Sequence, residues 1–544
     1  MLNMLNILNK IMAFKLFSLF IAITVAILTT GFLRLQLLSG LPEIDGGFYT
    51  SAARHIYLSL TNGDPILSIT LHLYQFMSSW VYSLEVNQYV LLRLIDGLIA
   101  IAASIILFKV ILKESGSTVF TFILMTTLLI IMNDVEIILY GFRNSIWAAF
   151  LPLFSSLLIW QNSSKEDKYS FYLIGGLVSF GILLREPFLP FFIFAGIAIL
   201  IGYGWRVLVK YLIGSAVSGF SILGFVLMFR NWDLIDLFNS YFFVGASIQN
   251  AGWKFPVHTI INANWFLICT ASASILYLIK LYLDKKLINL NRFYFWGILV
   301  IIPLIEYWSK LGLEYHLANC LIGLAGLSAL GWKYLSNNAS IRVKRSSLII
   351  LSLTSMFIIL PMVNNYIVKK DRIFTISEAI RWINTSDSFR SKNMVERSQY
   401  LKVASKVYGL SRENSTLAAD GHWEAILSLA NLSVPRSSVT GLTNYRLIAL
   451  RTEYRASGYD KNKIVQLIKE YRPTIILTSG KNAMTWKGAE AIPEIIIATN
   501  LYERVGHVPQ QFTYEDFYTT KVVQPGADPM GWIPATIWRL KDFK

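Results

Sequence analysis

Charged residues are scarce in this chain. Asp, Glu, Lys and Arg make up 15% of its 544 residues, whereas soluble domains carry about 25%. Hydrophobic residues reach 54%, and the mean hydropathy is +0.51. This balance excludes a cytosolic globular enzyme and a disordered protein. Cysteine is nearly absent too: Cys269 and Cys320 both lie in apolar runs, so we expect neither a disulfide framework nor a cysteine metal site.

Several catalytic motifs are also missing. The sequence holds no Walker loop, no Gly-x-Gly-x-x-Gly before a helix, no His-Glu-x-x-His and no Gly-x-Ser-x-Gly. An ATPase, a dinucleotide-binding enzyme and a zinc protease therefore have no support. The net charge of +16 does not indicate a nucleic-acid partner, because membrane proteins collect Lys and Arg on their inner face.

The sequence is instead rich in apolar runs of about 17–25 residues, the length of a membrane-spanning helix. Eleven such runs are found, at 13–36, 88–112, 118–133, 143–160, 169–184, 188–203, 211–229, 264–282, 293–309, 317–333 and 348–366. The first lacks a small-residue cleavage site and is expected to be an anchor rather than a signal peptide. The segment 65–84 is interrupted by polar residues and is predicted to be a helix in or near the interface, with a twelfth span as the alternative.

The basic residues set the orientation. With Met1 inside, 16 of the 24 Lys and Arg residues in 1–365 fall on the cytosolic side, and 11 of the 16 acidic residues fall on the other side. The expected fold is a polytopic α-helical membrane protein of about eleven transmembrane helices. Its domain 1–366 contains a first outer loop, 37–87.

The composition changes after about residue 366. The last 178 residues lose the long apolar runs and hold 25 Lys and Arg against 17 Asp and Glu. Amphipathic patterns predict helices, and short apolar runs bounded by Pro or Gly predict strands. The helices are expected at 375–386, 443–456 and 462–470, and the strands at 474–478 and 535–540. Residues 367–544 are therefore predicted to form a small α/β domain on the outer face.

The first outer loop carries two acids, Glu43 and Asp45, just before a helix expected to start near Gly47. A helix N-terminus favours the ionised form of an Asp beside it. Asp45 is thus suited to act as a base that deprotonates a hydroxyl acceptor, with Glu43 as its partner. A simple helix cap is the alternative, because Asp is common at that position.

A second acidic pair, Asp134 and Glu136, lies at the outer end of the third run. Two carboxylates two residues apart in a turn can face one divalent cation, Mg²⁺ or Mn²⁺. The alternative is a solvated turn.

Four basic residues at outer positions are candidates for binding a donor phosphate. Arg54 and Arg185 offer the planar guanidinium that suits phosphate oxygens, although Arg185 can equally pair with Glu186. His316 can bind a phosphate or a hydroxyl, or be structural. Arg372 lies where the chain leaves the last run and attracts lipid phosphates, either in the site or as a general membrane-surface contact.

A long acidic first outer loop, about eleven spans and an outer α/β domain together resemble the GT-C superfamily of membrane glycosyltransferases. The stretches 471–478, 501–505 and 537–540 are similar to outer domains of bacterial members. The resemblance implies that Glu43 or Asp45 is the base or orients the acceptor, and Asp134-Val-Glu136 looks like the second acidic motif of the family. The absence of a Trp-Trp-Asp motif favours transfer of a single sugar over asparagine-linked transfer.

The resemblance implies an enzyme of the bacterial cytoplasmic (inner) membrane with its C-terminal domain in the periplasm. Its donor would be a polyprenyl-phosphate-linked sugar, and its acceptor a glycan, lipid or protein hydroxyl. Three other classes remain open: an O-antigen-type polymerase or ligase, a polysaccharide flippase or transporter, and a non-catalytic scaffold or sensor. A transporter would place ionisable groups near mid-membrane, where this sequence has mainly Arg93 and Asp96.

Overall fold

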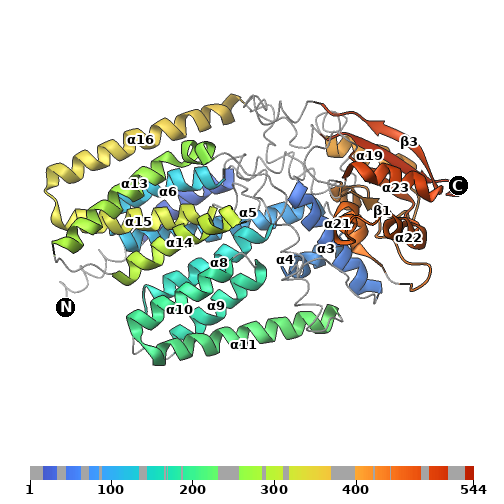
Figure 1. Ribbon diagram of the computed structural model, residues 1–544. Coiled ribbons are helices and arrows are strands. Elements are labelled where there is room, and N and C mark those ends of the chain that lie inside the picture. Colours follow the sequence, from blue (N-terminus) through green and yellow to red (C-terminus); the bar gives the residue numbers. More distant parts are fainter. Residues whose placement is uncertain are drawn as a thin grey trace.

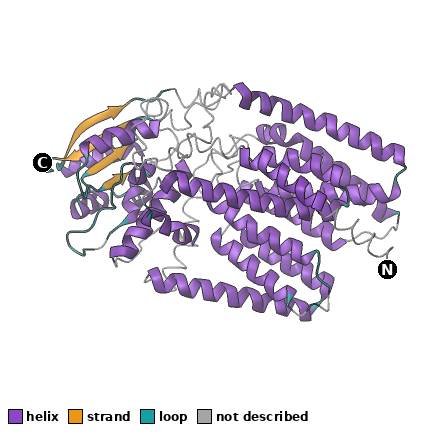
Figure 2. Ribbon diagram, turned by 180° about the vertical axis from the view of Figure 1, so that it is seen from behind, coloured by secondary structure: helices purple, strands orange, loops and turns teal. Residues whose placement is uncertain are grey.

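The computed structural model describes most of the chain, namely residues 16–32, 44–62, 73–84, 88–133, 144–164, 167, 169–185, 188–230, 257–284, 290–309, 318–368, 399–420, 423–441, 443–479, 489–511 and 533–543. These residues form two parts. One is a bundle of helices, and the other is a small sheet with its own helices at one end of that bundle (Figure 1). Figure 2 shows the same arrangement from behind.

A helix is present at each of the eleven apolar runs. The first covers 16–32 and contains a π-helical stretch, Ile27–Gly31. The others are α5 (Gln88–Ser115), α6 (Thr118–Met132), α8 (Asn144–Trp160), α9 (Ser170–Leu184), α10 (Leu189–Tyr203), α11 (Trp205–Arg230), α13 (Val257–Leu283), α14 (Leu290–Ser309), α15 (Ala318–Asn338) and α16 (Ile341–Val368).

Four helical segments in the described part of the chain are long and apolar enough to cross a membrane. They are Leu94–Ser115, Trp205–Phe225, Asn264–Leu283 and Ile341–Pro361. Further apolar helices are shorter, among them Thr118–Met132 and Ser170–Leu184. The chain is therefore a predominantly helical protein with several helices suited to a membrane.

Helices α9 and α11 approach each other closely through small residues. A Cβ placed on Gly175 of α9 would lie 2.0 Å from the Tyr211 carbonyl oxygen, and one on Gly214 of α11 would lie 2.0 Å from the Tyr172 carbonyl oxygen. Ser215 Oγ donates a hydrogen bond to the Gly175 carbonyl, at 3.0 Å. Small residues and interhelical hydroxyl bonds of this kind drive helix association in lipid, where the hydrophobic effect between helices is absent.

The sheet part has four strands in the order β1-β2-β4-β3. Strands β1 (Leu417–Ala419) and β2 (Ile475–Thr478) are parallel, whereas β4 (Ala535–Leu540) is antiparallel to β2 and to β3 (Tyr502–Val508). The strands predicted at 474–478 and 535–540 are thus present as β2 and β4. Strands β1 and β3 were not predicted.

Successive residues of these strands enter two different cores, as the alternation of a β-strand requires. Leu417, Ala419, Ile475 and Leu477 pack in one cluster with Tyr400 and Trp423. Ala418 and Ile476 pack in the other cluster, with Ile464, Ile468 and Ile492. Helices therefore cover both faces of the sheet. They are α19 (Gln399–Leu410), α20 (Ala425–Leu429), α21 (Leu450–Ala456), α22 (Lys461–Tyr471) and α23 (Ile492–Thr499).

The predicted helix at 462–470 matches α22. The predicted helix at 443–456 is instead divided into a 3₁₀ turn, Tyr445–Ile448, and α21. The helix predicted at 375–386 lies outside the described residues.

Candidate functional site

The described residues of the loop predicted at 37–87 form two helices between the bundle and the sheet part. They are α3 (Ile44–Asn62) and α4 (Leu73–Ser78), and α4 continues into the 3₁₀ helix η2 (Ser79–Ser83). Figure 1 shows α3 and α4 where the two parts meet. The helix expected within 65–84 is thus present over 73–83.

Helix α3 is tied to the sheet part by hydrogen bonds that link residues far apart in sequence. Ser51 Oγ donates to the Glu424 carbonyl at 2.6 Å, and Arg54 Nε donates to the Leu432 carbonyl at 3.0 Å. Tyr82 Oη lies 2.8 Å from the Thr50 carbonyl, to which it donates, and 2.9 Å from Ser428 Oγ. These bonds fix α3 against the segment that contains α20.

Apolar contacts hold the same helix on both sides. Ala52 belongs to the buried cluster of the sheet part. The next residue, Ala53, is buried with Val81, Tyr82 and Leu92, and Leu92 lies on α5 of the bundle. Because alanine is small, α3 can contact both parts at once, and it serves as the link between them.

The segment that α3 contacts leaves the carboxyl end of a parallel strand. Asp420 follows β1, Ser479 follows β2, and both residues are fully buried. Ser479 donates its backbone N–H to Asp420 Oδ2 at 2.5 Å and its hydroxyl to Oδ1 at 2.8 Å. Open α/β sheets bind ligands at the carboxyl ends of their strands. The segment 424–432, which α3 contacts, begins four residues after Asp420.

The starts of the two acidic segments lie side by side in the bundle. Asn133 ends α6 and immediately precedes Asp134, and its Nδ2 donates to Thr30 Oγ1 at 3.2 Å. Thr30 lies near the end of the first helix and also pairs with Ser104 of α5, at 2.9 Å. The helix ends that precede the two predicted acidic segments are therefore neighbours in the bundle.

The structure tests the predicted acids only in part. Helix α3 begins at Ile44, three residues earlier than expected, so Asp45 lies in the first helical turn and not before the helix. Packing of later turns stabilises a helix start that the Gly46-Gly47 pair alone disfavours. Glu43, Asp134 and Glu136 lie outside the described residues, and so do the basic candidates His316 and Arg372.

Of the residues predicted to bind the donor phosphate, the structure describes Arg54 and Arg185, and their surroundings differ. Arg54 is in the contact between α3 and the sheet part, where burial lowers the pKa of its guanidinium. Arg185 follows the last residue of α9 and is buried, with 5% of its surface exposed. Its backbone N–H bonds to the carbonyls of Gly181 and Ile182. The backbone of Arg185 is thus fixed at the helix end, and its side chain is held inside the protein.

Tyr82, Ser51 and Asp420 are contacts of this region that the sequence did not reveal. Tyr82 and Ser51 each form a hydrogen bond to a residue more than 300 positions later in the chain, and no local sequence pattern predicts such a contact. Asp420 had a possible signal, because an Asp that directly follows a short apolar strand is typical of a ligand-binding edge.

Burial raises the pKa of Tyr82 to about 12. The unfolded chain loses this proton near pH 10, so Tyr82 favours the folded state fully below pH 10, and this contribution falls as the pH rises from 10 to 12. We expect Tyr82→Phe to cost about 1–2 kcal/mol at neutral pH. The stability difference between the wild type and this variant should then shrink above pH 10 in denaturant titrations. A difference independent of pH would contradict the buried phenol.

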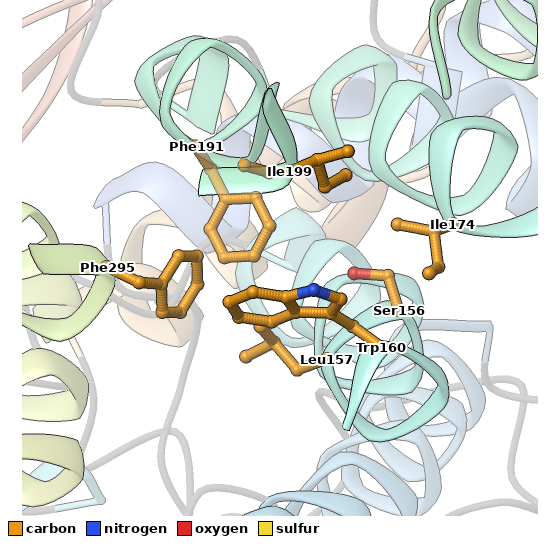
Figure 3. Close-up of a pocket in the computed structure, with 8 residues that line it drawn as sticks. Ser156, Leu157, Trp160, Ile174, Phe191, Ile199 and Phe295 are labelled. Carbon is orange, nitrogen blue, oxygen red and sulfur yellow. The ribbon is translucent and has the colours of Figure 1, made fainter. Parts of the chain in front are cut away.

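A hollow inside the bundle lies away from these residues. Figure 3 shows the Trp160 indole between Phe295 and Phe191 on one side and Ile174 and Ser156 on the other. The residues that line it carry no charge, and the Ser156 hydroxyl is bonded to the Leu153 carbonyl. The hollow is small, and it carries no group suited to the chemistry of the acidic loop.

A comparison of the chain with protein-family models and with curated proteins finds no match. Among the described residues, no group of three or more His, Cys, Asp or Glu side chains is placed to hold a metal ion. The pair Asp134 and Glu136 lies outside that part of the chain, so a divalent cation there stays a prediction.

Proposed function

We propose that this protein is an integral-membrane glycosyltransferase. It moves a sugar from a polyprenyl-phosphate-linked donor to a hydroxyl of a glycan, lipid or protein at the outer surface of the bacterial cytoplasmic membrane. The observation that carries the proposal is the position of α3. The helix whose first turn contains Asp45 is fixed between an apolar helical bundle and the segment that follows β1 of the α/β sheet.

This position suits a reaction between a lipid-linked donor and a polar acceptor. Asp45 precedes Ser51 by six residues, or about 9 Å along a helix that rises 1.5 Å per residue, so it is close to the contact with the sheet part. The positive end of α3 favours its carboxylate, and a carboxylate can take the proton from an acceptor hydroxyl. The acceptor would approach from the sheet side and the donor from the membrane side.

The departing phosphate needs positive groups to stabilise its charge. We assign this role first to Arg185, at the end of α9, with His316 and Arg372 as further contacts. Arg54 is assigned to hold α3, because its Nε is bonded to the Leu432 carbonyl. Glu43 would orient the acceptor or, with Asp134 and Glu136, bind a divalent cation that stabilises the leaving phosphate.

The proposal includes eleven spans with the N-terminus inside and residues 367–544 outside. It is supported by the 16-to-8 split of basic residues in 1–365 and by the eleven helices at the apolar runs. We expect alkaline phosphatase fused after Lys544 to be active, and a cytosolic fluorescent reporter at the same place to be dark. The reverse pattern would mean an even number of spans and would remove the outer-face site.

Replacement of Arg185 tests the donor side of the proposal. Arg185→Lys keeps the charge but loses the planar fork that binds two phosphate oxygens at once. We expect the donor KM to rise about tenfold or more in Arg185→Lys, because a charge-assisted hydrogen bond contributes about 1.5–3 kcal/mol, and to rise further in Arg185→Ala. The KM for the acceptor should not change.

Arg206→Lys is the matched control, because Arg206 is an exposed arginine on α11. An unchanged donor KM in both Arg185 variants would exclude this residue from the phosphate site. The glycosyltransferase proposal itself would survive that result if the variants still transferred sugar.

A further inference from the structure

A cluster of charges lies at the end of the bundle away from the sheet part. Glu114 is near the end of α5, about 33 Å along the helix from Leu92, which packs near α3. Its side chain is 1% exposed, and its Oε2 accepts hydrogen bonds from Arg292 of α14 at 2.5 Å and from Gln161 at 3.0 Å. One buried carboxylate thus joins α5, α14 and the end of α8.

Three cations lie at this end of the bundle. Arg292 pairs with Glu114 directly, and the positive charges of Arg292 and Lys333 both act on Lys113. Lys113 is exposed and donates a hydrogen bond to Asn162 Oδ1, whereas Arg292 and Lys333 are partly exposed. Glu114 balances only one of these three charges, so the cluster keeps an excess of two positive charges.

Among the described residues, the two further charges found near this cluster do not remove this excess. Asp167 and Arg292 both act electrostatically on Tyr203 at the end of α10. Lys210 donates a hydrogen bond to the Asp167 backbone carbonyl, at 3.4 Å. The charges of Asp167 and Lys210 cancel, so the cluster keeps its excess of two positive charges.

The surroundings are those of a membrane surface. Trp205 at the start of α11 is 64% exposed, and Tyr169 just before α9 is 78% exposed. Aromatic residues at helix ends are typical of the headgroup layer. Uncompensated basic residues between helix ends on that layer attract anionic lipid headgroups.

We propose that Lys113, Arg292 and Lys333 bind the headgroup phosphate of an anionic phospholipid. This site is separate from the proposed transferase site and does not depend on it. Because the lipid would bridge α5, α14 and α15, it should stabilise the bundle at this end.

The test measures lipid binding to the full-length protein by native mass spectrometry. The protein is titrated separately with phosphatidylglycerol, phosphatidylcholine and inorganic phosphate. Each Lys near an anionic surface contributes about a fivefold increase in affinity. We expect Lys333→Gln to weaken phosphatidylglycerol binding about fivefold, and Lys113→Gln/Lys333→Gln about 25-fold. Arg292 is left intact because its loss would leave the buried Glu114 unpaired.

The matched control is Lys280→Gln/Lys344→Gln, which removes two lysines from α13 and α16 and should leave binding unchanged. Three results would each overturn the proposal: equal loss in the control, equal binding of phosphatidylcholine, or displacement of the lipid by millimolar inorganic phosphate. If the double variant fails to fold, the single Lys333→Gln variant decides the question. Unchanged binding there also overturns the proposal.

Discussion

Asp45→Asn is expected to lower sugar transfer about 10²–10⁴-fold, the contribution of a general base. Asn keeps the size and shape of the side chain but cannot accept the proton of the acceptor hydroxyl. Donor binding, membrane insertion and expression should stay near the wild type, because Asn is tolerated in the first turn of α3 about as well as Asp. The measurement is single-turnover transfer from a polyprenyl-phosphate sugar at saturating donor.

The variant Glu43→Gln distinguishes the role of Glu43 from that of Asp45. If Glu43 orients the acceptor, its loss should raise the acceptor KM with a smaller effect on turnover. Near-normal turnover in Asp45→Asn together with an inactive Glu43→Gln would transfer the role of base to Glu43. Full activity in both variants would show that the acidic loop does not carry the reaction.

Gly214→Ala is expected to lower the free energy of unfolding of the bundle by about 3 kcal/mol, at the upper end of the usual cost of overpacking. The added methyl group would lie 2.0 Å from the Tyr172 carbonyl oxygen and 2.7 Å from the carbonyl carbon. These are backbone atoms of α9 that no side-chain rotation can move, so the two helices must separate. Separation would also weaken the hydrogen bonds of Ser215 to Gly175 and of Ser218 to Gly176. Reversible unfolding in mixed micelles measures the change.

Gly224→Ala is the matched control on the same helix. A Cβ at Gly224 meets no atom within 4 Å, and alanine is favoured over glycine in a helix by about 1 kcal/mol. This variant should therefore be as stable as the wild type or slightly more stable. Equal destabilisation by the two substitutions would contradict the close approach of α9 and α11.

The positions of the bundle helices could be predicted because each depends on a long local run of apolar residues. The predicted ends were less accurate where helices continue into charged turns. Helix α16 begins at Ile341 rather than 348, and its added turns contain Arg342, Lys344 and Arg345. Hydropathy falls at such charges, whereas backbone hydrogen bonding continues past them. The same effect extends α11 back to Trp205.

Strands β1 and β3 were not predicted because they lack the sequence pattern by which a buried strand is recognised. Strand β1 has only three residues, two of them alanines. Strand β3 is paired on one side only, contains a bulge between Arg504 and Gly506, and exposes Glu503 and Arg504. Edge strands often carry charges and bulges of this kind, which makes them resemble loops in a sequence.

The sequence predicts which residue types could form the candidate site, and the roles of Glu43 and Asp45 stay predictions. The contact of α3 with the sheet part could not be inferred, since it joins Ser51 to Glu424 and Arg54 to Leu432 across the whole membrane domain. For Arg54 the structure shows a hydrogen bond to the Leu432 carbonyl that no local pattern predicts.

The central claim is tested most directly by donor consumption. Purified protein in nanodiscs would be incubated with a panel of radiolabelled polyprenyl-phosphate sugars and a membrane extract as acceptor source, with nucleotide sugars as the parallel donors. With the wild type, we expect at least one lipid-linked donor to release polyprenyl phosphate and to label an acceptor, and we expect Asp45→Asn to abolish both. Consumption of nucleotide sugars alone, or no consumption of any lipid-linked donor by folded protein, would contradict it.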